Sequence, residues 1–302
     1  MTEQTKKMDV NFVITDLDDT IWDWLEMWYQ SFMPYLNRIA EETGIDIDIL
    51  KKEFKKLHEK YGTTEMSFIY KELPSINQSF YPIFEEAVDG KKSILHEYNS
   101  NKKNNLTAYE GVIDTLKYIK NQGSKIVAFT ESNVFFTKYR IKHLGLDTII
   151  DTVYSPEGYQ IPDSVYKHYS EDYWALKQTI IKTLPNGTRK PNVEILNTIV
   201  NDFNADKNKS IYIGDKLDRD IYMAQQAGIT SIHAEYGHII DGDRYDLLRE
   251  VTHWSPEDVE REKQFKSQKL DIPSPDYTLK SFDELLKLFH FTKFADAESK
   301  FV

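Results

Sequence analysis

The sequence predicts an α/β fold in which helices sandwich a largely parallel sheet, with a smaller, mostly helical domain attached. Short apolar runs rich in β-forming residues recur along the 302 residues, and stretches with helical periodicity lie between them. Strands that alternate with helices in this way are typical of parallel sheets. One long segment after the first strand breaks the alternation and shows only helical patterns, which indicates the second domain.

The predicted strands are short and apolar. The first covers residues 10–15 (Val-Asn-Phe-Val-Ile-Thr) and runs directly into acidic residues. A continuous apolar run of this length fits the buried middle of a parallel sheet. Similar runs predict strands at 125–130, 149–153, 210–213 and 229–233, and a last edge strand over 276–280 before a final helix over 282–289.

Helical spacing fills the intervals between these strands. Val112, Leu116 and Ile119 fall on one face of a helix that ends near Gly123. A second helix is expected after Pro191, where apolar residues repeat at helical spacing. Both helices therefore have one apolar face with which to cover the sheet.

The segment from residue 23 to 106 shows the pattern of several helices, with breaks at Gly44, Pro74 and Gly90. We expect it to form a separate helical domain, and residues 1–22 with 107–302 to form the core. The aromatic residues crowded at its start are expected to pack inside the protein rather than to contact substrate. Two stretches of the core, near 158–186 and 236–275, exceed ordinary loop length and are expected to be insertions.

Composition excludes several classes of function. The net charge is −11 and no dense block of Lys or Arg occurs, so binding to nucleic acid is disfavoured. The chain has no cysteine, which excludes disulfides, zinc–thiolate sites and thiol nucleophiles. No apolar stretch of signal-peptide or membrane-spanning length is present. We therefore expect a soluble, cytoplasmic protein without a membrane partner.

Four short polar sites follow predicted strands or precede predicted helices, at the sheet edge where open α/β folds bind ligands. The first is the pair Asp16 and Asp18, directly after the first strand. Two carboxylates at one strand end can divide the chemistry, because one can attack phosphorus while the other moves protons. Acidic turns after strands are common, so this pair alone is a moderate signal.

The second and third sites offer groups that suit a phosphate. Thr130 ends a predicted strand and Glu131 follows it, so a hydroxyl and nearby backbone N–H groups can form a phosphate-binding site. Lys190 stands just before a helix, from where it can reach a phosphate or a nucleophilic carboxylate. Taken singly, the threonine is more often a helix cap and the lysine a solvated surface residue.

The fourth site is the run from Gly214 to Asp220, which carries three aspartates in six residues, at 215, 218 and 220. Such a concentration of carboxylates is costly unless a cation neutralises it. The alternative is a solvated acidic helix start. We favour a metal site.

In this order, the four sites resemble the motifs of the haloacid dehalogenase-like (HAD) hydrolase superfamily. Asp16-Leu-Asp-Asp-Thr20 matches the first motif, Thr130 the second, Lys190 with Pro191 the third, and Gly214-Asp215 through Asp220 the fourth. The resemblance covers residues 8–22 and 107–235. It implies a Rossmann-like core, with the helical segment 23–106 as a cap domain inserted after the first motif.

The resemblance also implies roles for these residues. Asp16 would be the nucleophile that forms an aspartyl-phosphate, and Asp18 would protonate the leaving group and later activate water. Thr130, Glu131 and Lys190 would bind the phosphoryl group. Mg²⁺ would be held by Asp16, the backbone carbonyl of Asp18 and Asp215, with Asp220 supporting the metal shell or pairing with Lys190.

These roles predict a phosphoric monoester hydrolase that acts on a small phosphorylated metabolite. A phosphomutase or phosphotransferase with the same intermediate is the alternative, and a non-catalytic binding protein of the same fold is a third possibility. Dehalogenases that resemble this fold lack the second aspartate of the first motif, so Asp18 disfavours that chemistry. The oligomeric state cannot be predicted from the sequence.

Overall fold

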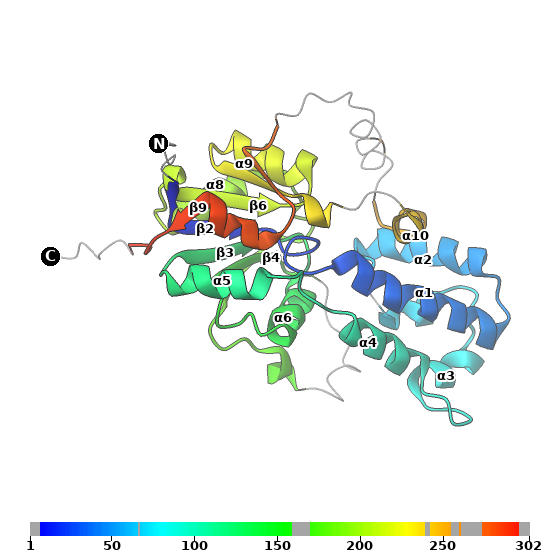
Figure 1. The fold of residues 1–302 in the computed structure, drawn as a ribbon. Helices are drawn as coiled ribbons and strands as arrows, with labels where there is room; N and C mark the ends of the chain where they lie inside the picture. Colours follow the sequence, from blue (N-terminus) through cyan, green and yellow to red (C-terminus); the bar gives the residue numbers. More distant parts are fainter. Residues whose placement is uncertain are drawn as a thin grey trace. The chain divides into compact units, whose positions relative to one another are not determined.

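The computed structural model describes residues 7–65, 67–158, 170–238, 242–254, 260 and 274–295. The chain divides into two compact units (Figure 1). The core unit consists of Met1–Trp22, Ala108–His238 and Asp271–Val302, and the helical unit of Asp23–Thr107 and Ile239–Leu270. Of the two long stretches expected to be insertions, residues 159–169, 239–241, 255–259 and 261–273 lie outside the described residues.

The core unit is built on a seven-stranded sheet with the order β5-β4-β3-β2-β6-β7-β8. Every neighbouring pair in it is parallel, which confirms the predicted α/β fold class. The strands are β2 (Phe12–Thr15), β3 (Lys125–Phe129), β4 (Thr152–Pro156), β5 (Ile180–Leu184), β6 (Ser210–Gly214), β7 (Thr230–Ala234) and β8 (Tyr277–Leu279).

Helices cover both faces of this sheet. Figure 1 shows α5 (Val112–Asn121) and α6 (Val134–His143) on one side, and α8 (Val193–Asp202) and α9 (Tyr222–Gln226) on the other. Shorter helical turns connect these elements: η3 (Glu171–Trp174), η4 (Lys207–Lys209), η5 (Leu217–Ile221), η6 (Glu235–Gly237), η7 (Phe282–Glu284) and α12 (Leu285–Leu288). Apolar side chains of α8 and α9 pack on β2, β3 and β6 in one buried cluster.

The register of the central strands places the polar sites side by side. Thr15, the last residue of β2, is paired with Ala128 on β3 and with Ile213 on β6. The residues that follow these three strands therefore emerge at the same edge of the sheet. All of β2 is buried, as its continuous apolar sequence predicts.

Several element boundaries differ from the sequence prediction. The strand expected at 149–153 lies at Thr152–Pro156, because Ile149 and Ile150 are buried in the turn before it. The helix expected at 282–289 ends at Leu288, and β9 (Phe289–Phe291) then pairs in parallel with β1 (Met8–Val10). β5 falls inside the stretch 158–186 and forms an edge of the sheet. Its half-exposed sequence has no continuous apolar run to reveal it.

The helical unit contains α1 (Trp24–Thr43), α2 (Ile47–Tyr61), η1 (Ser67–Glu72), η2 (Gln78–Phe80), α3 (Tyr81–Glu85), α4 (Ile94–Asn104) and α10 (Asp243–Val251). Its buried cluster is rich in aromatics, including Trp28, Phe32 and Phe54. Stacked and edge-to-face ring pairs connect these side chains. The aromatic residues at the start of the segment therefore form much of this unit's core.

A segment far along the chain completes the helical unit. Tyr245, Leu248 and Val251 of α10 belong to the same buried cluster as α1 and α2. The Nδ1 of His58 donates to the carbonyl oxygen of Val251 at 2.7 Å. Burial lowers the pKa of His58 to about 4, so this ring is neutral at physiological pH. An ion pair of 2.8 Å joins Lys51 to Glu250 on the same helices.

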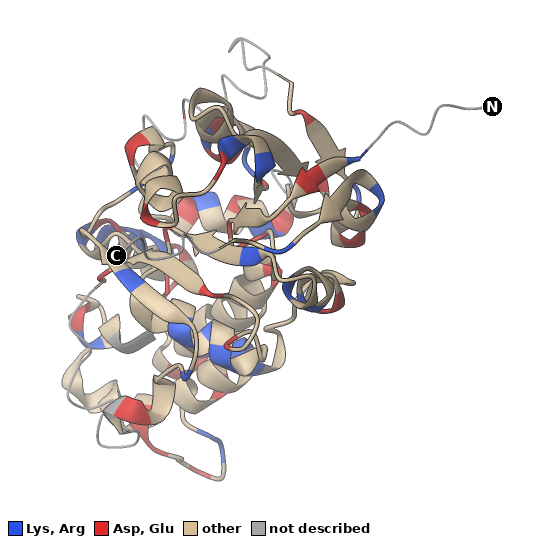
Figure 2. Cartoon of the chain, turned by 90° about the vertical axis from the view of Figure 1, so that its left-hand side faces the viewer, with Lys and Arg blue, Asp and Glu red and all other residues tan. Residues whose placement is uncertain are grey.

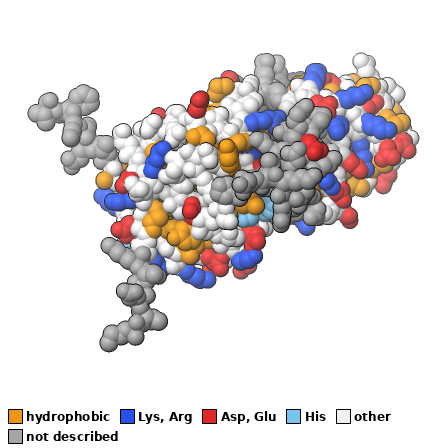
Figure 3. Space-filling view, turned by 90° about the horizontal axis from the view of Figure 1, so that it is seen from above, with side chains coloured by type: hydrophobic (Ala, Val, Ile, Leu, Met, Phe, Trp, Pro, Cys, Tyr) orange, Lys and Arg blue, Asp and Glu red, His pale blue; other side chains and the backbone are white. Residues whose placement is uncertain are grey.

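Charged residues of both signs are interspersed over the described elements (Figure 2), and Figure 3 shows the same mixture on one face of the molecule. The absence of nucleic-acid binding stays a prediction. None of the described helices combines the length and apolarity that a membrane crossing needs.

Candidate active site

Three aspartates form a compact carboxylate cluster at the carboxyl edge of the sheet. Asp16 follows β2, and its backbone N–H continues the strand pairing by donating to Ile213 at 2.8 Å. Asp215 follows β6, and Asp220 belongs to the next helical turn, η5. One carboxylate oxygen from each aspartate lies within 4.8 Å of the other two, and all three side chains are buried.

Lys190 is the buried cation of this cluster. Its Nζ lies 2.6 Å from Asp16 Oδ1 and 2.9 Å from Asp220 Oδ1. Asp220 also accepts from the Tyr212 hydroxyl at 2.9 Å and from the backbone N–H of Lys216 at 3.2 Å. Both oxygens of Asp220 are therefore engaged by protein donors, which suits a supporting position rather than direct ligation of a metal.

Burial disfavours the charged forms of the side chains in this cluster. It raises the pKa of Asp16 well above its ordinary value, although the charge of Lys190 opposes the shift. It likewise raises the pKa of Asp215 to about 6, against the opposing charge of Lys216. Burial alone would lower the pKa of Lys190, but the charges of Asp16 and Asp220 outweigh it and raise that pKa well above normal.

The donor set fits a hard divalent cation. Asp215 Oδ2 is buried, and Lys216 Nζ lies 2.7 Å from it as an ion-pair partner. Buried carboxylates need positive partners, and this cluster holds three such carboxylates. Carboxylate oxygens are the ligands that Mg²⁺ prefers in proteins. The cluster can therefore hold such an ion through Asp16 and Asp215.

Asp18 lies on the same loop as Asp16, but its carboxylate has other partners. Its Oδ1 accepts from Trp22 Nε1 at 2.6 Å and from Arg140 Nη1 at 3.2 Å. The Asp18 side chain is 24% exposed. Asp18 is thus oriented by residues outside the carboxylate cluster, and its side chain keeps contact with solvent.

The second predicted site is brought close to the third and fourth. Thr130 is buried, and its hydroxyl oxygen accepts from the backbone N–H of Ser132 at 3.0 Å. Glu131 Oε1 accepts from the backbone N–H of Lys190 at 2.9 Å, and its Oε2 accepts from Arg219 at 3.1 Å. The Glu131 carboxylate therefore ties three loops together. Since both carboxylate oxygens have these partners, the backbone N–H of Glu131 is the group left to contact a phosphate. Its role in phosphate binding stays a prediction.

A model of the haloacid dehalogenase-like hydrolase family matches residues 10–228, which is most of the chain. The chain is a HAD hydrolase. The resemblance seen in the four sequence motifs is therefore confirmed. A curated relative, the glyceraldehyde 3-phosphate phosphatase of Pyrococcus furiosus, is 22% identical over 235 residues, covering 78% of this chain and 84% of the relative.

Two solved structures share the fold of this HAD hydrolase. A HAD phosphatase from Thermococcus onnurineus has a TM-score of 0.52 and 16% identity, covering 94% of this chain and 100% of the other. A magnesium-bound HAD hydrolase from Bacillus subtilis has a TM-score of 0.50 and 15% identity, covering 93% of this chain and 99% of the other. At these identities the likeness concerns the fold.

The end of β7 and the turn after it contribute contacts that the sequence analysis missed. The rings of His233 and His238 each place a nitrogen against the backbone oxygen of Asp215, at 3.1 and 2.8 Å. A Cβ on Gly237 would lie 1.5 Å from the backbone oxygen of Asp19, so only glycine fits there. No periodicity or motif spacing marks this turn. A lone glycine beside a strand end was the available signal.

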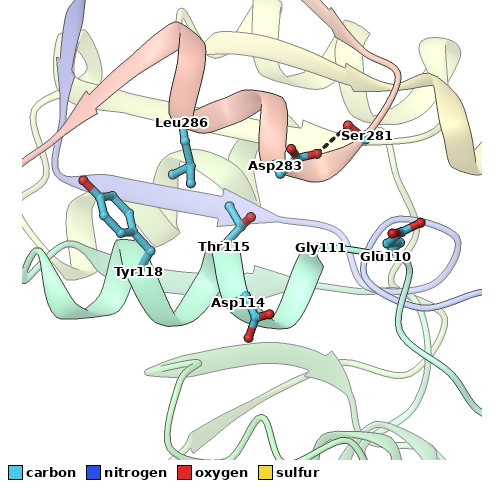
Figure 4. Close-up of a pocket in the computed structure, with 8 residues that line it drawn as sticks. All are labelled: Glu110, Gly111, Asp114, Thr115, Tyr118, Ser281, Asp283 and Leu286. Atoms are coloured by element: carbon cyan, nitrogen blue, oxygen red, sulfur yellow. Dashed lines mark hydrogen bonds between the residues drawn. The ribbon is translucent and has the colours of Figure 1, made fainter.

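The HAD hydrolase also has a separate open hollow of about 640 Å³ in its core unit, between α5 and the segment Ser281–Leu286. Figure 4 shows Glu110, Asp114 and Asp283 among its lining residues, with Ser281 hydrogen-bonded to Asp283. None of the predicted site residues lines it. The carboxylate cluster, not this hollow, is the candidate for catalysis.

Proposed function

We propose that this HAD hydrolase is a Mg²⁺-dependent phosphatase that hydrolyses a small phosphorylated metabolite through an aspartyl-phosphate intermediate on Asp16. The observation that supports it most is the buried meeting of Asp16, Asp215 and Lys190. A nucleophilic carboxylate can approach an anionic phosphate only where positive charge offsets the repulsion. In this cluster Lys190 supplies a buried positive charge, and Asp16 and Asp215 offer ligands for a metal cation.

In the first step, a carboxylate oxygen of Asp16 attacks phosphorus and the bond from phosphorus to the ester oxygen breaks. The departing alkoxide takes a proton from Asp18, so it leaves as an alcohol. In the second step, Asp18 accepts a proton from a water molecule that attacks the phosphorus. The bond to Asp16 then breaks, and inorganic phosphate leaves with Asp16 and Asp18 restored.

The remaining residues hold the reacting groups. Lys190 favours the ionised form of Asp16 against the effect of burial and stabilises negative charge on the phosphoryl oxygens, while Thr130 and the backbone of Glu131 bind those oxygens. Asp16, Asp215 and the carbonyl of Asp18 would hold Mg²⁺. When bound, the cation supplies charge neutralisation for the phosphoryl group and its attacking carboxylate. Asp220 holds Lys190 in place.

The substrate class is a small phosphate monoester such as a sugar phosphate, a phosphoglycolate-like acid or a nucleoside monophosphate. The Pyrococcus furiosus relative is named for a phosphorylated three-carbon aldehyde, which supports including triose phosphates. The protein should release inorganic phosphate from p-nitrophenyl phosphate and from one or more members of a panel of these metabolites. Removal of Mg²⁺ with EDTA should lower the rate of phosphate release at least about 100-fold.

Product analysis by phosphate assay and mass spectrometry checks this proposal. Inorganic phosphate should appear in equal amount to the alcohol product. Isomerised substrate without phosphate release would contradict hydrolysis and favour a mutase. A full rate in EDTA after extensive dialysis would contradict the metal dependence.

The raised pKa of Asp215 predicts how Mg²⁺ affects stability. Its value of about 6, against an ordinary 3.8, means that the folded metal-free protein holds this proton more tightly than the unfolded chain does. The contribution of Asp215 to metal-free stability is therefore full below about pH 4 and lost as the pH rises through about 6. Mg²⁺ binds the ionised form, so its stabilising effect has the opposite pH dependence.

Thermal unfolding with and without Mg²⁺ measures this effect. The rise in Tm caused by Mg²⁺ should be larger at about pH 7.5 than at about pH 5. The rise should disappear in the Asp215→Asn variant. An equal rise at both pH values would mean that Asp215 does not bind the ion.

A further inference from the structure

Arg140 is a buried guanidinium that no sequence motif marks. It lies on α6, the helix after the second site, and its side chain is 0% exposed. A buried arginine is rare unless an anion and hydrogen-bond acceptors compensate for its lost hydration. Its partners therefore indicate why the fold retains it.

Those partners connect Arg140 to Asp18. Nη1 of Arg140 lies 3.2 Å from Asp18 Oδ1 and donates to the Ser132 hydroxyl at 2.8 Å. The guanidinium also lies 6.0 Å from the centroid of the Trp22 ring and 5.9 Å from that of Phe136. It is thus held by an aromatic ring on each of two segments and by the loop after Thr130.

Trp22 supplies a second hydrogen-bond donor to the Asp18 carboxylate. Its indole Nε1 donates to the same oxygen of Asp18 at 2.6 Å, and its ring is fully buried. Two donors from separate segments therefore converge on one carboxylate oxygen. Convergence of this kind restricts the rotation of the carboxylate and sets which way its second oxygen points.

We propose that Arg140, together with Trp22, is a positioning residue that aims the Asp18 carboxylate at the leaving-group oxygen. Both side chains are buried and direct a donor at the Asp18 carboxylate, so both act through Asp18. This role rests on the proposed phosphatase function, since it concerns the residue that protonates the departing alkoxide. It goes beyond the four motifs, none of which contains Arg140.

The dependence of the rate on the leaving group tests this role. p-Nitrophenolate departs without much help from an acid, whereas the alkoxide of glycerol phosphate needs a proton. In Trp22→Phe and Arg140→Lys, kcat/KM for glycerol phosphate should fall about 10- to 100-fold, with kcat rather than KM changed. For p-nitrophenyl phosphate, kcat/KM should fall less than about 3-fold, with the lysine variant retaining more activity than Arg140→Met.

A double-mutant cycle separates positioning from folding. In an Asp18→Asn background, Arg140→Lys should cause little further loss, because the group that it positions is gone. Lys120→Met serves as the control, since it removes a 2.6 Å ion pair with Asp151 elsewhere in the core unit. This control should lower kcat/KM equally for both substrates or leave both values unchanged. If Arg140→Met fails to fold, as judged by circular dichroism, Trp22→Phe decides, because it keeps a smaller aromatic ring at this position and removes the donor.

Three outcomes would overturn the role. These are an equal loss on both substrates in the folded variants, an additive loss in the Asp18→Asn background, and full activity of Trp22→Phe and Arg140→Lys on glycerol phosphate. A failure of the proposed function looks different, because the wild-type protein itself would then release no phosphate from either substrate with Mg²⁺. That result would remove both proposals together.

Discussion

Replacing Asp16 with asparagine should abolish phosphate release, with kcat at least about 10⁴-fold below the wild type. The amide has nearly the same shape but is a poor nucleophile, and it cannot form the acyl-phosphate. The wild-type protein, quenched during turnover, should show the added mass of one phosphoryl group on the peptide that contains Asp16. The variant should show none.

Asp202→Asn is a matched control for this substitution. Asp202 lies in the core unit, on α8, and pairs with Lys182 at 2.6 Å on the protein surface. The control should keep full activity, since an exposed ion pair contributes about 1 kcal/mol or less to stability. Retention of activity in Asp16→Asn, with the control also active, would refute Asp16 as the nucleophile.

Replacing Lys190 with methionine should impair both catalysis and stability. The substitution leaves Asp16 and Asp220 buried without the cation that lies 2.6 and 2.9 Å from them. Removal of one partner from a buried ionic group typically costs about 3–5 kcal/mol. The loss of positive charge beside the phosphoryl group should also lower kcat about 10³-fold. Urea unfolding in EDTA and steady-state kinetics in Mg²⁺ measure the two effects separately.

The pH dependence of this variant has a definite direction. Burial raises the pKa of Asp16, and the positive charge of Lys190 opposes this rise. Loss of Lys190 should therefore raise the pKa of Asp16 further. Residual activity should therefore require higher pH than in the wild type. Lys125→Met is the control, because Lys125 makes a partly exposed ion pair of 3.3 Å with Asp151. It should cost about 1 kcal/mol or less. Wild-type stability and rate in Lys190→Met would contradict the proposed importance of this cation.

Much of the fold could be predicted because it is encoded in local patterns. The apolar run that ends at Thr15 indicates a buried central strand, and the following Asp16 indicates where chemistry takes place. Once the strands are parallel, their carboxyl ends share an edge, so carboxylates far apart in sequence are expected to meet. The family resemblance implied that Asp220 would support the metal shell or pair with Lys190, and the two side chains lie 2.9 Å apart.

The features that escaped prediction depend on long-range packing. β5 is a half-exposed edge strand, so it lacks the apolar run by which a central strand is recognised. Arg140 and Asp18 are separated by 122 positions, and neither the helical spacing around Arg140 nor its residue type indicates a buried contact. The turn at Gly237 is required by a backbone contact with Asp19, which sequence patterns do not encode.

The attachment of α10 to α1 and α2 has a consequence for engineering this enzyme. The segment Asp23–Thr107 does not form a complete unit by itself, because residues beyond His238 supply part of its apolar core. A graft of Asp23–Thr107 alone onto another protein would expose the apolar surface that Leu248 and Val251 cover here. Any exchange of the helical unit must move both pieces of chain together.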